Sequence, residues 1–149
     1  MKITLLALVT LFSLQSFAAE TIRLNPMLAN YCDWDLGTLN DLSQYTDGVL
    51  VSKAFCGQGA RSHTGEYFDH TLRGQITVNL DQSGVIPMKS MFLNYCSMAK
   101  GYLDTLASLS RGGLIFTGKC TTGGYGPDGR YYKGVLDGSF KYTAGAAQE

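Results

Sequence analysis

The sequence has 149 residues, which fits one ordinary domain or two very small ones. It is 45% hydrophobic and 16% charged, a balance typical of a packed globule rather than of a disordered chain. Twelve basic residues offset twelve acidic ones. Because nucleic-acid binders and acidic-membrane binders usually carry an excess of positive charge, the composition indicates neither class, and no nucleic-acid partner is expected.

The first residues have the pattern of a secretory signal. A positive start at Lys2 precedes an uncharged run from Ile3 to Leu14, and small residues follow at Ala18 and Ala19. This pattern predicts a signal peptide over residues 1–18. The run is shorter than the roughly 20 apolar residues that cross a bilayer, so no stable membrane insertion is expected. We expect export to the periplasm or the extracellular space, and a single mature domain over residues 19–149.

The four cysteines are Cys32, Cys56, Cys96 and Cys120, separated by 24, 40 and 24 residues. An even number of cysteines in a small exported chain favours two disulfide bonds. Zinc sites usually draw their cysteines from pairs two to four residues apart, a spacing that this chain lacks.

The equal spacings indicate an internal repeat. A shift of 64 residues superimposes Asn30-Tyr31-Cys32 on Asn94-Tyr95-Cys96, and Cys56 on Cys120. Further identical pairs at this offset are Ile22/Ile86, Met27/Met91, Leu39/Leu103, Leu42/Leu106, Gly48/Gly112, Leu50/Leu114, Gly59/Gly123, Gly65/Gly129, Tyr67/Tyr131, Leu72/Leu136 and Gly74/Gly138. We therefore predict a tandem duplication with units at about 22–79 and 86–143. Each unit is too small for a convincing core of its own, so the two should share one.

Each unit opens with a helical pattern. In the second unit, apolar residues recur at steps of three and four and predict a helix over 88–109: Met88, Phe92, Tyr95, Ala99, Tyr102, Leu106 and Leu109. In the first unit Asn25 could cap a helix that starts at Pro26. Asp33-Trp34-Asp35 and Gly37 are expected to interrupt or shorten that helix.

Two strands with period-two alternation follow each helix, at about 50–56 and 68–78 and again at about 114–120 and 132–142. Ten-residue glycine-rich loops, 57–66 and 121–130, connect them. One side of each strand is apolar and the other polar, as in antiparallel sheets with one wet face. The predicted fold is α+β, with two helices on one face of a four-stranded antiparallel sheet.

The predicted fold restricts how the cysteines pair. Three connectivities are possible. Pairing Cys32 with Cys96 and Cys56 with Cys120 ranks last, because both bonds would then lie on the symmetry axis. The local solution, Cys32–Cys56 and Cys96–Cys120, is preferred over the exchanged one, Cys32–Cys120 and Cys56–Cys96, which also obeys the symmetry.

The two hairpin loops supply the candidate binding residues Arg61, His63, Tyr125 and Arg130. Loops on a rigid scaffold often carry binding residues, and Tyr and Arg are enriched at interface hot spots. We find no catalytic constellation and expect no cofactor. The expected function is that of an exported, non-catalytic binding or inhibitor-like module that recognises a macromolecular partner through these loops, and a protein is the kind of partner considered.

Two alternatives remain open. His63, Glu66 and His70 could form a small metal site or a metal-dependent active site, because imidazole and carboxylate groups suit zinc. Against that, the second unit has Pro127, Arg130 and Gly134 at the same places, and loop residues are often simply solvated. The other alternative is a structural envelope component that associates with itself.

In architecture alone, an exported pair of α-β-β units with one disulfide each resembles the β-lactamase inhibitory proteins. The sequence carries none of their motifs, so the resemblance bears on the fold only.

Overall fold

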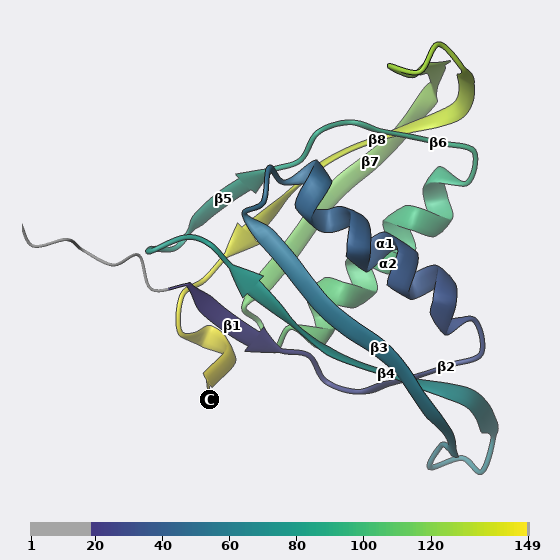
Figure 1. Cartoon of the computed structure of the whole chain (residues 1–149), viewed down its shortest axis with the longest axis vertical. Coiled ribbons are helices and arrows are strands. Elements are labelled where there is room, and N and C mark those ends of the chain that lie inside the picture. Colours follow the sequence, from purple (N-terminus) through teal and green to yellow (C-terminus); the bar gives the residue numbers. More distant parts are fainter. Residues whose placement is uncertain (1–18, 149) are drawn as a thin grey trace, which may run out of the picture.

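Two long β-hairpins and two helices make up most of the fold (Figure 1). The computed structural model describes residues 19–148, and the predicted signal peptide, 1–18, lies outside them. The elements of the first unit are β1 (Glu20–Arg23), β2 (Met27–Ala29), α1 (Cys32–Tyr45), β3 (Leu50–Arg61) and β4 (Tyr67–Val78). Those of the second are β5 (Gly84–Pro87), β6 (Met91–Leu93), α2 (Cys96–Leu109), β7 (Leu114–Tyr125) and β8 (Tyr131–Tyr142), followed by a 3-10 turn, η1 (Ala146–Gln148).

The duplication is confirmed, because equivalent elements of the two units begin and end 64 residues apart. The strand pairing repeats with the same offset: Glu20 lies opposite Val78 in the first unit, and Gly84 lies opposite Tyr142 in the second. The identical glycines just beyond the helices, Gly48 and Gly112, have positive φ angles of 77° and 82°. The same chain geometry therefore ends both helices.

The α+β class and the antiparallel pairing are confirmed, but there are two four-stranded sheets where one was expected. In each unit the second long strand is central. It pairs with the first long strand on one edge and with two short strands in succession on the other. These short strands, β1 and β2 or β5 and β6, come from the stretch before the helix, which completes a sheet within each unit.

The helix predicted over 88–109 is shorter than expected and begins at Cys96. Residues 84–87 and 91–93 are strands instead, with Ile86 buried between exposed neighbours. Pro87 ends the edge strand β5, where a missing N–H costs little. The first unit shows the same correction: no helix begins at Pro26, and α1 runs without a break through Asp33-Trp34-Asp35 and Gly37.

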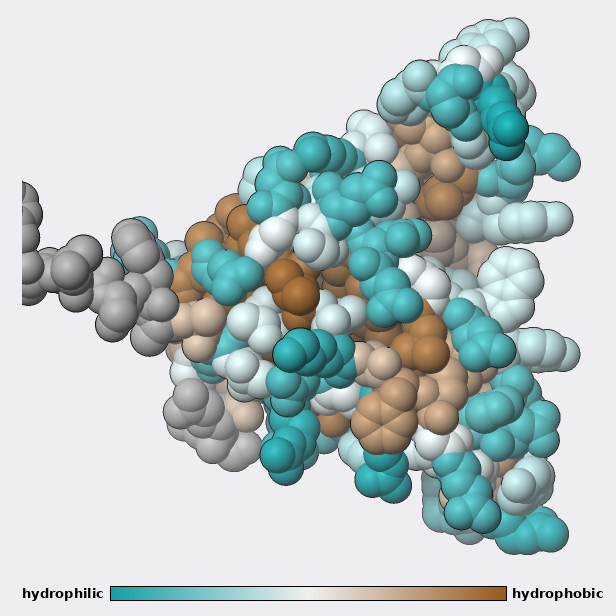
Figure 2. Space-filling model, in the orientation of Figure 1, coloured by the Kyte–Doolittle hydropathy of each residue, from teal (hydrophilic) through white to brown (hydrophobic). Residues whose placement is uncertain are grey.

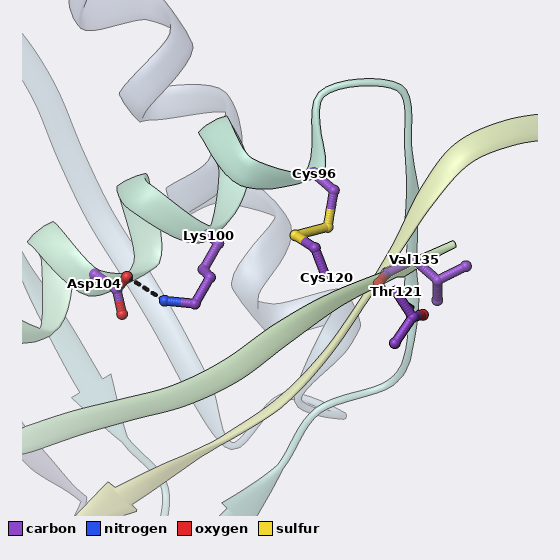
Figure 3. The surroundings of a disulfide bond; sticks show 6 residues. All are labelled: Cys96, Lys100, Asp104, Cys120, Thr121 and Val135. Carbon is purple, nitrogen blue, oxygen red and sulfur yellow. Dashed lines mark hydrogen bonds and ion pairs between the residues drawn. A yellow bond between two sulfur atoms is a disulfide. The ribbon is translucent and has the colours of Figure 1, made fainter. Parts of the chain in front are cut away.

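The predicted local disulfides are confirmed. Cys32 is bonded to Cys56, and Cys96 to Cys120, each with a Cα–Cα distance of 5.9 Å. Each bond ties the first residue of a helix to the middle of the hairpin beneath it, as Figure 3 shows for Cys96 and Cys120. The apolar side of each strand faces the helix as predicted, with Leu50, Leu72 and Ile76 almost fully buried.

The two units are joined by reciprocal contacts. The backbone N–H of Asn25 donates to the carbonyl of Leu109 (2.9 Å), and that of Lys89 donates to the carbonyl of Tyr45 (2.8 Å). The offset of 64 relates these two bonds, so each unit satisfies the last turn of the other unit's helix. The buried apolar residues of both units form one continuous core, in which Ile22 of the first unit packs against Gly113 of the second.

Candidate functional site

In the Asn-Tyr-Cys motif at the start of each helix, the tyrosine side chain is exposed to solvent. The cysteine after it is buried and disulfide-bonded. The asparagine before it accepts a hydrogen bond from a strand: Asn30 Oδ1 from the N–H of Asp69 (3.1 Å), and Asn94 Oδ1 from the N–H of Lys133 (3.3 Å). Because the chain is fixed on both sides, the tyrosines between project outward. Their exposed fractions are 76% for Tyr31 and 70% for Tyr95.

Both helices begin on the same side of the molecule, between the two hairpins (Figure 1). Residues one turn into the helices add to the exposed apolar surface there, since Trp34 is 58% exposed and Met98 47%. These two residues are equivalent under the repeat. Figure 2 shows pale side chains of intermediate hydropathy projecting from this side. We call Tyr31, Trp34, Tyr95 and Met98 the helix-start cluster.

A groove of about 510 Å³ runs beside this cluster, between the first turns of α1 and α2. One wall comes from α1, and the other from β6, α2 and β8. Its lining is Asp33, Trp34, Gly37, Thr38, Asp41, Phe92, Leu93, Asn94, Tyr95, Met98, Ala99, Tyr102 and Tyr132. The α1 wall is open at Gly37, which has no side chain, and a Cβ added there would have no atom within 4 Å.

The polar groups of the groove include two carboxylates, Asp33 and Asp41, and three tyrosine hydroxyls, on Tyr95, Tyr102 and Tyr132, beside the neutral side chains of Thr38 and Asn94. Burial raises the pKa of Asp35, just below the groove, and burial together with the charge of Asp35 raises the pKa of Tyr102. The hydroxyl of Tyr132 donates to Asp128 Oδ2 (2.6 Å). That bond is the main cause of both the lowered pKa of Asp128 and the raised pKa of Tyr132. It also ties the loop 126–130 to the groove wall.

Arg61, His63, Tyr125 and Arg130 are all exposed. The predicted loop bounds, 57–66 and 121–130, are wrong, because strand pairing continues to Arg61 in β3 and to Tyr125 in β7 and leaves shorter loops at 62–66 and 126–130. The structure does not bring the two loops together, because the hairpin tips lie at opposite ends of the long axis (Figure 1). The guanidinium of Arg61 lies over the ring of Tyr67 at 6.0 Å and donates to the carbonyl of Gly65.

At the other tip, Tyr125 stacks edge-on against Tyr131, with the ring centroids 5.4 Å apart. Arg130 approaches Asp128 only to 4.0 Å, which leaves its guanidinium open to solvent. Each tip therefore carries exposed tyrosine and arginine side chains, but only the first hairpin stacks its arginine on a ring.

The proposed metal ligands are not assembled. Within residues 19–148, no three His, Cys, Asp or Glu side chains are placed to hold a metal ion. His63 and Glu66 are exposed at the loop, whereas His70 is half-buried on β4 with its Nδ1 unbonded.

Sequence reasoning missed the helix-start cluster. It used the tyrosines of the Asn-Tyr-Cys motif as markers of the repeat and did not single out Trp34. It also placed Tyr95 on the apolar face of the predicted helix, whereas Tyr95 lies just before α2 and is exposed. A signal was present: a residue next to a buried cysteine in the first turn of a helix points away from the core. The single tryptophan of the chain, two residues after Cys32, lies in the same first turn.

No helix in the described part of the chain is long and apolar enough to cross a membrane. Comparison with known proteins finds no match: no family model, no curated protein and no solved structure matches the chain. The functional argument therefore depends on the residues and their geometry.

Proposed function

We propose that this is an exported module that binds a macromolecular partner through the side of the molecule between its hairpin tips. The observation that carries the proposal is the helix-start cluster, in which three aromatic side chains and one methionine are exposed to solvent beside an open groove. Large exposed apolar patches on soluble proteins often mark interaction sites, and Trp, Tyr and Met are enriched in protein interfaces.

Rigidity supports a binding role. Each exposed tyrosine of the cluster is fixed between a disulfide and an asparagine anchor, so little conformational freedom remains to be lost on association. Aromatic side chains also supply a large contact area with few rotatable bonds. The loop residues Arg61, His63, Tyr125 and Arg130 would then contact the partner at the two ends of the same side.

Two disulfides fit a protein that works in an oxidising compartment, and they support the proposed export to the periplasm or the extracellular space. In this proposal the segment 1–18 acts as the signal peptide. A protein is the favoured partner, because the cluster has the composition of a protein interface.

Affinity capture with paired groove variants tests the proposal. Gly37 lines the groove, so the side chain in Gly37→Leu should fill it. The fold should tolerate this change, because a Cβ at position 37 has no atom within 4 Å and leucine is a better helix former than glycine. Gly101→Leu is the matched control, because Gly101 is the repeat equivalent and is equally open but does not line the groove. Trp34→Ala removes the indole ring from the helix-start cluster.

The wild type and Gly101→Leu should capture the same proteins from envelope and culture fractions. Gly37→Leu and Trp34→Ala should no longer capture these proteins. Circular dichroism should show that all four proteins are folded. Identical captures by all four chains would refute the assignment of this surface.

A further inference from the structure

A second hollow, on the outer face of the first unit's sheet, is lined by basic side chains. Its volume is about 830 Å³. Arg23 of β1, Lys53 of β3 and Arg73 of β4 line it, and Arg111, just after α2, reaches it from the second unit. It shares no lining residue with the groove described above.

The strand register explains how these side chains meet. On β4, Gln75 lies between Arg23 on one neighbouring strand and Lys53 on the other. The next outward position of β4 is Arg73, opposite Phe55. These residues alternate with buried or half-buried ones, so they lie on the outer face of the sheet, and Asn40 of α1 also borders the hollow.

The positive charge in this hollow is not balanced locally. No carboxylate lines it, and none of its four cations takes part in an ion pair within residues 19–148. Arg111 is instead oriented by a neutral partner, since its Nε donates to Asn25 Oδ1 at 2.9 Å. In a chain whose charges sum to zero, four cations around one hollow concentrate positive potential there.

The second unit shows that the fold does not require this charge. Its equivalents of Arg23, Lys53 and Arg73 are Pro87, Thr117 and Asp137. The equivalent of Arg111 is Asp47, which pairs with Lys89. The same backbone thus carries a basic surface in one unit and a mixed one in the other.

We infer that the hollow binds a small, multiply charged oxyanion of the phosphate type, as found in phosphate and sulfate esters. Arginine matches such anions with two parallel N–H donors, and three of the four cations are arginines. The side-chain amides of Asn40 and Gln75 line the same space and can donate to further oxygens. The ring of Phe55, 57% exposed, offers an apolar surface to the rest of an esterified ligand.

Calorimetric titration of the mature protein with pyrophosphate at low ionic strength tests this inference, with inorganic phosphate as the smaller probe. Arg73→Gln and Lys53→Gln each remove one cation from an exposed position and should leave the thermal midpoint unchanged. Lys119→Gln is the matched control: Lys119 is the repeat equivalent of Phe55, on the outer face of the second sheet opposite Asp137.

Pyrophosphate should bind the wild type about tenfold more tightly than phosphate, because several cations act together. Arg73→Gln and Lys53→Gln should each weaken binding by about tenfold, whereas Lys119→Gln should match the wild type. The inference is overturned by an absence of binding to millimolar pyrophosphate, by equal affinities for the two anions, or by equal losses in Arg73→Gln and Lys119→Gln.

Discussion

At the scale of single residues, the fold clearly alters the acidity of Tyr142. It lies at the end of β8 with only 2% of its surface exposed, and its hydroxyl donates to Glu20 at the start of β1. Burial and this hydrogen bond raise the pKa of Tyr142 to about 12. The pair connects the last strand of one unit to the first strand of the other.

A raised pKa in the folded state makes stability depend on pH. An unfolded tyrosine titrates near pH 10, so the contribution of neutral Tyr142 is complete below about pH 10 and is lost as the pH rises to about 12. Urea unfolding of the wild type and of Tyr142→Phe should therefore show the wild type losing stability faster over this interval. Parallel pH profiles of the two proteins would contradict this assignment.

At the scale of elements, a buried hydroxyl ends each helix. Thr46 Oγ1 donates to the carbonyl of Leu42 (2.7 Å) and accepts from the N–H of Leu50 (3.0 Å). Ser110 holds the equivalent place after α2 and accepts from the N–H of Leu114 at 2.9 Å. Each hydroxyl thus connects the end of a helix to the start of the next strand.

Thr46→Val keeps the side-chain shape but removes both hydrogen bonds, leaving a buried N–H without this acceptor. We expect the free energy of unfolding to fall by about 1–3 kcal/mol. Ser108→Ala removes an exposed hydroxyl that forms a hydrogen bond within α2, and should change the free energy of unfolding by less than about 0.5 kcal/mol. Urea denaturation measures both changes, and equal losses would show that burial of the hydroxyl does not matter.

The sequence predicted the long strands better than the helix starts, for a physical reason. Alternation of apolar and polar residues over a long run, as at 68–78 in β4, is hard to produce by chance. The end of β3 was still missed, since β3 continues past Cys56 to Arg61 by pairing with β4. By contrast, Met88 and Phe92 continue the three-and-four spacing of α2 although they lie outside it, since Met88 lies between β5 and β6 and Phe92 lies in β6. Contacts with β8, distant in sequence, hold both residues: the N–H of Met88 donates to the carbonyl of Gly138, and Phe92 lies opposite Val135.

The candidate site was predictable only in part. Arg61, His63, Tyr125 and Arg130 are exposed near the hairpin tips, but Arg61 and Tyr125 end strands, because the glycine-rich stretches that indicate loops partly continue the strand pairing. The groove could not be read from the sequence, since its walls come from α1, β6, α2 and β8. Its existence depends on how the two helices approach each other across the pseudo-two-fold axis.

At the scale of the whole molecule, the shared core should make the two units unfold together. Leu42, 1% exposed on α1, belongs to the same continuous core as the second unit. Leu42→Ala should therefore lower the hydrogen-exchange protection of slowly exchanging amides in β8 as much as in β4, by about 2–5 kcal/mol. Protection in β8 at the wild-type level would mean that the units fold independently.

The central claim is that the helix-start cluster contacts a partner, and photo-crosslinking tests it most directly. The crosslinking amino acid p-benzoylphenylalanine would be placed at position 95, in place of exposed Tyr95, in the cells that produce the protein. The control is position 85 on β5, where Val85 is similarly exposed at 69% but lies away from the helix starts (Figure 1). Irradiation should give a defined heavier adduct from position 95 and none from position 85. Adducts of equal yield at both positions, or none at position 95, would contradict the claim.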